Sequence, residues 1–120
     1  MTSKELSQKI AKLMSDKKAE DIIILDLRKL TAITDYFVIC SASSDTQVKA
    51  ISDHVSKELS KIQEKPWHNE GYGNLSWILL DYVDVVAHIF YGQTRKFYNL
   101  EGLWGDAEIE YYTDEVNEKK

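Results

Sequence analysis

Asp81 and Asp84 are the two carboxylates of this 120-residue sequence whose spacing comes closest to a catalytic arrangement. They stand three residues apart between two apolar runs, and paired carboxylates are what a magnesium-dependent phosphoryl transfer requires. Across a tight turn, however, the two side chains need not converge on one ion. Aspartate is also common in turns because its side chain accepts hydrogen bonds from nearby backbone N–H groups. The spacing therefore indicates a turn rather than a metal site.

His88 is the second candidate, since a histidine can act as a general base. The sequence places no serine, cysteine or carboxylate beside it, so we interpret it as a structural or interface residue. His54, His68 and His88 lack the i, i+4 spacing of a helical zinc site. Gly71-Tyr72-Gly73 precedes a predicted strand, whereas a phosphate-binding loop must precede a helix. We therefore predict no catalytic residue, no bound metal and no cofactor.

Aromatic side chains form a more informative group. Its members are Trp67, Trp77, Trp104, Tyr72, Tyr82 and Tyr98. Tryptophan and tyrosine are enriched at the centres of protein–protein interfaces. Trp77 and Tyr82 are close in sequence to the acidic Asp84, which predicts a docking surface for a protein partner. The alternative is that Trp77 packs in the core, and the residue types alone favour neither.

The element that must position these residues is a central hairpin over residues 77–90. Both of its runs are rich in β-branched and aromatic residues, which favour strands. Neither face of the second strand is polar enough to face water along its whole length. We therefore expect helices to cover one face of the hairpin, and helices or a partner to cover the other.

Periodicity and capping signals predict the other elements. Helices are expected at 2–18, 43–63 and 94–104, and further strands at 21–27, 36–42 and 67–70. Thr2 with Glu5, and Ser44 with Gln47, have the spacing of a capping box at the start of a helix. Pro66 marks residues 67–70 as an edge strand, because proline cannot donate to a sheet ladder.

The last predicted helix is short. Thr94 is expected to cap it, Phe97, Leu100 and Trp104 share one of its faces, and Gly105 ends it. The predicted order is therefore helix-strand-strand-helix-strand-strand-strand-helix, a single domain of α/β class with a mixed α+β sheet and flanking helices. An acidic tail is expected at 106–120.

The distribution of charge predicts the kind of partner. The net charge is −5, yet residues 1–100 hold 13 acidic and 13 basic side chains, while residues 101–120 hold 7 acidic and 2 basic. A balanced body lacks the basic patch of a nucleic-acid-binding protein. A balanced body with an acidic tail suits a basic protein partner better.

Cys40 is the single cysteine, so an intramolecular disulfide is excluded and a reduced compartment is expected. Its place in an apolar strand predicts a small buried residue rather than a nucleophile. No apolar run approaches the ~18 residues that cross a bilayer, and no signal-peptide core follows Met1. We expect a soluble cytoplasmic protein that does not bind a membrane.

Five motifs follow one another along residues 2–105. They are Asp21-Ile22-Ile23, Thr34-Asp35-Tyr36-Phe37-Val38-Ile39-Cys40, Trp77-Ile78-Leu79-Leu80-Asp81, Asp84-Val85-Val86-Ala87-His88-Ile89-Phe90 and Thr94-Arg95-Lys96-Phe97-Tyr98-Asn99-Leu100-Glu101-Gly102-Leu103-Trp104. Each motif alone is weak, but together and in this order they resemble the ribosomal silencing factor family, RsfS or Iojap-like. The resemblance implies a nucleotidyltransferase-like fold in a protein that is not an enzyme.

The resemblance also implies a partner and an effect. Family members bind the fourteenth-named protein of the large ribosomal subunit, block joining with the small subunit and silence translation under nutrient limitation. Members commonly pair as homodimers when free. By position, Trp77 and Leu80 would supply apolar contacts to the partner, and Tyr82, Asp84 and His88 polar contacts. The alternatives are a large-subunit assembly factor and a divergent metal-dependent nucleotidyltransferase.

Val83 departs from the family, which usually has glycine at this position. Glycine readily adopts the positive φ of a tight hairpin turn, whereas valine strongly disfavours it. We therefore expect a hairpin turn of another type or of greater length here. The Ser41-Ala42-Ser43-Ser44 segment also lacks the glycine of a nucleotidyltransferase loop, which argues against that activity.

Overall fold

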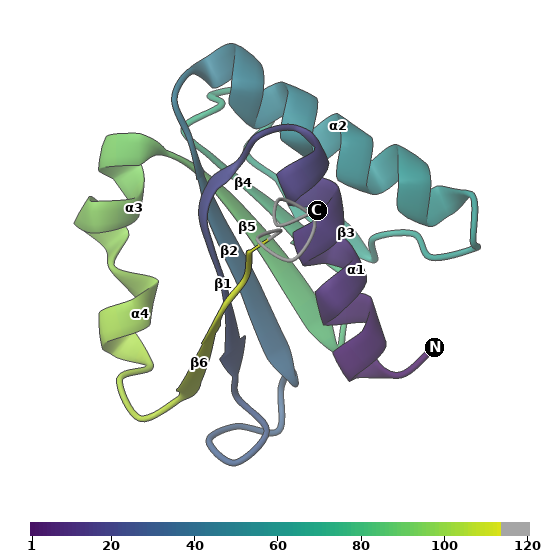
Figure 1. Ribbon diagram of the computed structural model, residues 1–120, viewed down its shortest axis with the longest axis vertical. Helices are drawn as coiled ribbons and strands as arrows, with labels where there is room; N and C mark the ends of the chain where they lie inside the picture. The colour runs from purple at the N-terminus through teal and green to yellow at the C-terminus, as the bar shows by residue number, and fades with distance from the viewer. Residues whose placement is uncertain (114–120) are drawn as a thin grey trace, which may run out of the picture.

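The computed structural model describes residues 1–113, in which helices pack on both faces of one six-stranded mixed sheet (Figure 1). The helices are α1 (Ser3–Asp16), α2 (Asp45–Ser60), α3 (Gly92–Tyr98) and α4 (Leu100–Leu103). The strands are β1 (Glu20–Asp26), β2 (Tyr36–Ala42), β3 (His68–Glu70), β4 (Trp77–Asp81), β5 (Val85–Tyr91) and β6 (Glu108–Tyr111). Their order across the sheet is β3-β4-β5-β2-β1-β6. β2 and β5 pair in parallel, and the other neighbours pair antiparallel.

Helices α1 and α2 begin where the capping signals predict. The Thr2 side chain accepts from the backbone N–H of Glu5, and the Glu5 carboxylate accepts from the N–H of Thr2 at 2.8 Å, which completes a capping box. Ser44 accepts from the N–H of Gln47 in the same way. The Gln47 amide donates to the carbonyls of residues 17 and 18, so it ties the start of α2 to the end of α1.

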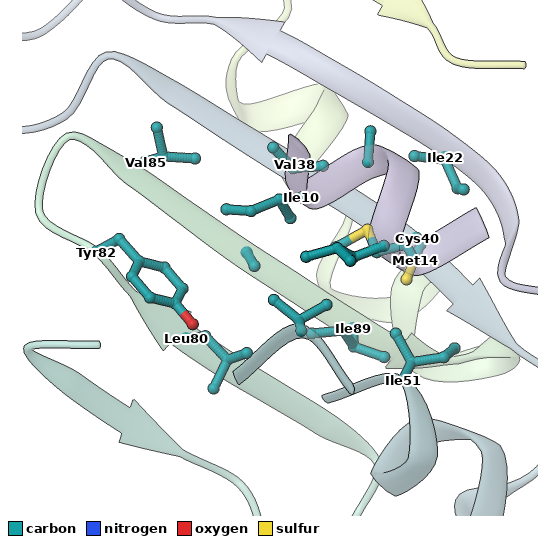
Figure 2. Packing of buried hydrophobic residues seen from close by; sticks show 14 of the residues in the cluster. Ile10, Met14, Ile22, Val38, Cys40, Ile51, Leu80, Tyr82, Val85 and Ile89 are labelled. Atoms are coloured by element: carbon teal, nitrogen blue, oxygen red, sulfur yellow. The ribbon is translucent and has the colours of Figure 1, made fainter. Parts of the chain in front are cut away.

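One face of the sheet packs against α1 and α2 and forms the larger core. Figure 2 shows this core from close by, with side chains from both helices and from the inner strands converging. Its labelled members are Ile10, Met14, Ile22, Val38, Cys40, Ile51, Leu80, Tyr82, Val85 and Ile89. Burying an aliphatic side chain of this size stabilises the fold by about 1.5–3 kcal/mol. The apolar stripes of the two predicted helices are therefore confirmed as core faces.

The opposite face of the sheet is covered in part, by α3 and α4 (Figure 1). A second, smaller core forms there, and its buried members are Ile23, Leu25, Leu27, Ile39, Phe90 and Leu100. Arg95 of α3 fastens this layer, because its guanidinium donates to the carbonyl of Asp21, to the Ser41 hydroxyl and to the Glu101 carboxylate. The rest of this face lacks a helical cover among residues 1–113, and we call it the open face.

Two sequence predictions are corrected at the C-terminal end. The predicted order omitted β6, which lies within the predicted acidic tail and pairs antiparallel with β1. The predicted helix 94–104 is two helices, because Asn99 takes a left-handed conformation with φ 47°. The first of them begins at Gly92, so Thr94 is not its cap, and Phe97 is 81% exposed rather than on a shared apolar face. Residues 114–120 of the predicted tail lie outside the described residues.

The predicted hairpin is confirmed and its turn is of another type, as expected, but Val83 itself takes the positive φ that valine disfavours. Val83 adopts φ 74°, and the N–H of Asp84 donates to the carbonyl of Tyr82 at 3.0 Å. A bond between residues i and i+2 around a residue with this φ is a γ-turn, a rare and strained type. The Asp81 carboxylate accepts from the N–H of Val83 at 2.8 Å and so supports the turn. Valine therefore occupies a conformation that glycine would adopt freely.

Val83→Gly is accordingly expected to stabilise the protein by about 1 kcal/mol. The left-handed conformation costs a side chain with a Cβ about 1–2 kcal/mol, and the greater freedom of glycine in the unfolded chain offsets part of that gain. Val83 is 54% exposed, so little buried area is lost. The free energy of unfolding from urea titration measures the change. Val86→Gly, in the buried extended strand of the same hairpin, is the matched control and should destabilise; a lower stability for both variants would contradict the strain.

Candidate docking surface

The hairpin places alternate side chains on the open face. Trp77, Leu79 and Asp81 of β4 pair across the ladder with residues of β5 that share this face. Those partners are Phe90, His88 and Val86, in that order. Because side chains of a strand alternate between the two faces, residues 78 and 80 of the same strand point to α1 and α2 instead.

An apolar hollow of about 540 Å³ lies on the open face. Its lining residues come from the loop before β2, from β2, β4, β5 and the turn between the last two, from the residue before β3 and from the end of α4: Thr31, Ile33, Thr34, Phe37, Trp67, Leu79, Asp81, Val83, Val86, His88 and Trp104. Trp67 is 76% exposed and Ile33 is 85% exposed. Large exposed apolar side chains gathered around a concavity are typical of an interaction site.

His88 lies in the wall of this hollow and is 3% exposed. The indole N–H of Trp77 donates to its Nδ1 at 3.1 Å. The Phe37 ring meets the imidazole edge to face, with 4.4 Å between the ring centroids. Trp77 is itself fixed by Phe90 and Tyr98, with ring centroids 4.9 Å and 4.7 Å away. Trp77 therefore connects His88, a lining residue of the hollow, to the aromatic rings beneath α3.

Burial lowers the pKa of His88 to about 3, because the protein interior disfavours the charged imidazolium. The imidazole is therefore neutral at physiological pH and a poor proton acceptor. This agrees with the structural or interface role that the sequence predicts, and it does not favour general-base catalysis.

The residues predicted as partner contacts do not form one surface. Trp77 and His88 lie together on the open face, and Asp84 lies in the exposed turn at one end of the hairpin. Leu80 is fully buried and Tyr82 is 7% exposed, and both belong to the core beneath α1 and α2 (Figure 2). In this structure neither Leu80 nor Tyr82 is accessible to a partner.

Sequence reasoning missed most of the hollow. Phe37 and Trp104 reach it from elements distant in sequence, so no local pattern reveals them. Leu79 and Val86 had a usable signal, because residues two apart on a strand share a face with Trp77 and His88 respectively. The predicted docking surface is thus shifted from the Leu80 side of the hairpin to the Leu79 side.

A second hollow, of about 700 Å³, lies where β2 and β5 end and α3 begins. The carboxyl ends of parallel strands are where many α/β proteins bind ligands. Here, however, the guanidinium of Arg95 is occupied by Glu101, Ser41 and a backbone carbonyl. Arg95, the cation at the centre of this hollow, therefore has a structural role.

Metal and thiol chemistry find little support in the described part of the chain. Across residues 1–113 no three histidine, cysteine, aspartate or glutamate side chains gather as metal ligands. Burial raises the pKa of the Cys40 thiol to about 12, which makes it inert, as predicted. None of the helices in this range has the length and apolar character needed to cross a membrane.

Comparison with known proteins gives one family. The family model described as "Ribosomal silencing factor during starvation" matches residues 1–120. The ribosomal silencing factor RsfS of Bacillus subtilis is 38% identical over 109 residues, which cover 91% of this chain and 92% of that protein. A crystal structure of a Chromobacterium violaceum protein superposes with a TM-score of 0.85 at 31% identity and covers 94% of both chains. The mouse mitochondrial assembly of ribosomal large subunit protein 1 is 30% identical over 98 residues, 79% of this chain and 43% of that protein. The chain therefore belongs to the ribosomal silencing factor family, RsfS.

Proposed function

We propose that this protein binds the large ribosomal subunit through its fourteenth-named protein and blocks joining with the small subunit, which represses translation under nutrient limitation. The observation that carries the proposal is the apolar hollow on the open face, in a chain of the RsfS family. The large subunit as partner is further supported by the name of the mouse relative, which refers to assembly of that subunit.

The chemistry of the hollow suits a basic protein. Its floor offers tryptophan and other large apolar side chains, the residue types that dominate interface energetics. Asp81 lies in its lining and Asp84 in the turn beside Val83, so a basic side chain of the partner finds carboxylates next to the apolar contact. Such charge complementarity speeds association and orients the partner.

The effect on joining follows from occupancy of a surface rather than from chemistry. A domain whose Cα atoms extend 36 × 34 × 31 Å is large enough to keep two subunits apart if it sits on the face where they meet. The proposal therefore requires no catalytic residue and no cofactor. The free protein is cytoplasmic in this scheme, and it pairs as a homodimer through the same apolar face when no ribosome is bound.

An assembly role is the second candidate function, and the name of the mouse relative favours it specifically. It shares the partner but not the effect on joining. A magnesium-dependent nucleotidyltransferase is the alternative from another class. The Asp81 carboxylate is already committed to the N–H of Val83, which favours the turn role over metal binding. That alternative predicts nucleotide binding that Asp84→Asn abolishes.

Sedimentation of purified large and small subunits, mixed in magnesium with and without the protein, tests the proposal. We expect the protein to travel with the large subunit and the joined particle to decline in proportion to the protein added. The subunits without the protein are the control. Binding to the large subunit with normal joining would favour the assembly role, and binding to neither subunit would overturn both.

A further inference from the structure

Trp67 is a tryptophan that the fold leaves almost uncovered. The residue is 76% exposed, although tryptophan is highly buried on average in folded proteins. It lines the apolar hollow directly before β3, and its backbone N–H donates to the carbonyl of Asp81 at 2.7 Å. The backbone of Trp67 is therefore anchored beside Asp81, while most of its indole is accessible to a partner.

Acidic side chains adjoin this indole on the open face. Asp81 lines the hollow together with Trp67. Glu70 lies directly opposite Leu79 in the ladder of β3 and β4, and directly opposite residues share a face, so Glu70 is on the open face too. Its carboxylate contacts Nε2 of His68 at 2.6 Å. Among residues 1–113, no lysine or arginine lines the hollow. This end of the hollow therefore combines an exposed aromatic ring with acidic groups and has no cation of its own.

The hairpin turn leaves Asp81 able to bind a cation. Its Oδ1 accepts from the N–H of Val83 at 2.8 Å. A carboxylate has two oxygens and about four lone-pair sites, so this single bond uses a small part of its capacity. Asp81 is also partly buried, and a partly desolvated carboxylate attracts a cation more strongly than one in open water.

A lysine or arginine side chain matches both parts of this site. Such a side chain packs its methylene stem along apolar surface and keeps its charged head at a polar rim. Here the stem would contact Leu79 and Val86, and the head would lie between the Trp67 ring and the Asp81 carboxylate. A cation over an indole is attracted by the ring, and the carboxylate adds a charge-assisted hydrogen bond. An acidic side chain would be repelled by Asp81, and an apolar one would desolvate Asp81 without replacing the lost water.

We propose that Trp67 and Asp81 form a binding site for one arginine or lysine side chain of the large-subunit protein, with the stem of that side chain in the apolar hollow. This rests on the proposed function, which supplies the partner, and it adds Trp67, which was not among the predicted partner contacts. The walls of the hollow supply affinity. Trp67 and Asp81 supply specificity, because they disfavour a neutral or acidic side chain at the same position.

Titration of the dye-labelled full-length protein with purified large subunits, at about 0.1 M and about 0.3 M KCl, tests the site because salt screens charge pairs. Asp81→Asn keeps the oxygen that accepts from Val83 but removes the charge, so binding should weaken roughly 10-fold at the lower salt and less at the higher. Trp67→Leu keeps an apolar side chain but removes the ring, and roughly 10-fold weakening is expected at both. Trp67→Phe retains a ring and should bind within about threefold of wild type.

Two matched controls lie away from the hollow. Asp53→Asn removes an exposed carboxylate of α2, on the other side of the sheet. Tyr111→Leu removes an exposed ring of β6. Both should bind like wild type and keep its salt dependence, and circular dichroism shows whether each variant is folded.

If folded Trp67→Leu binds like wild type, or if Asp81→Asn binds like wild type at the lower salt, the cation site is refuted while the proposed function stands. Binding of Trp67→Phe as weak as that of Trp67→Leu would contradict a cation over the ring in the same way. If wild type does not bind the large subunit, the proposed function itself fails.

Discussion

Lowering the pH from 6.5 to 4 is expected to destabilise this protein by about 3 kcal/mol through His88. The folded pKa of His88 is about 3, whereas an unfolded histidine has a pKa near 6.5, so the unfolded chain binds the extra proton. The stabilisation that depends on neutral His88 is complete above pH 6.5 and is lost as the pH falls towards 3. Each pH unit in that window costs roughly 1.4 kcal/mol, or about 3 kcal/mol between pH 6.5 and 4.

A loss of this size is a large part of the 5–15 kcal/mol that typically stabilises a domain. Urea titrations at half-unit steps from pH 7 to 4, followed by circular dichroism, measure it directly. His88→Gln should flatten the dependence because it removes the titrating group. Ser52→Ala, at a buried residue that does not titrate, is the control and should leave the slope as it is. A wild-type stability that does not change between pH 6.5 and 4.5 would show that His88 is not buried as described.

Trp77→Ala is expected to weaken binding to the large ribosomal subunit at least tenfold, a loss of roughly 1.4 kcal/mol or more. The indole is partly buried on the same face as the hollow, where it packs on Phe90 and Tyr98 and donates to Nδ1 of His88, a residue of the lining. Its removal therefore takes away apolar surface beside the hollow and the contact that holds His88 in place. Co-sedimentation with the large subunit at a series of protein concentrations gives the change in affinity.

The variant must be shown to fold, because truncating a partly buried tryptophan also lowers stability. Circular dichroism provides that check, together with a thermal melt whose midpoint must lie above the temperature of the binding assay. Tyr111→Ala is the matched control, since Tyr111 is 74% exposed on β6, the edge strand opposite to β3, and it does not line the apolar hollow. Wild-type affinity in a folded Trp77→Ala protein would place the interface elsewhere.

Local patterns were enough to predict most elements of this fold. Short apolar runs rich in β-branched and aromatic residues located β1, β2, β4 and β5, and apolar stripes with capping signals located α1 and α2. β6 was missed because its strand character comes from pairing with β1, more than eighty residues away in sequence, and all of its residues are exposed. The break at Asn99 did have a local signal, because asparagine adopts the left-handed conformation more readily than most residues and its side chain accepts from the N–H of Gly102.

The partner contacts predicted from the sequence stay a prediction, but the structure separates them. Trp77 and Leu80 were predicted to make one apolar contact, whereas Trp77 lies on the same face as His88 and Leu80 lies in the core. Residues 77 and 80 are three apart, and in a strand an odd separation places side chains on opposite faces. Applying that rule along the hairpin would have exchanged Leu80 for Leu79. The contributions of Phe37 and Trp104 depend on strand order and on the path after α4, which the sequence does not reveal.

The pairing of β6 with β1 has a consequence for how the molecule is made. β1 is the first of the six strands to leave the ribosome and β6 the last, yet they are neighbours in the finished sheet. Domains generally begin to fold from the N-terminal side during synthesis. Until β6 emerges, β1 has a free edge of unpaired backbone groups, the kind of edge that recruits strands from other chains. A protein proposed to act on ribosomes thus completes its own sheet only after β6, the last of the six strands, has left the ribosome that synthesises it.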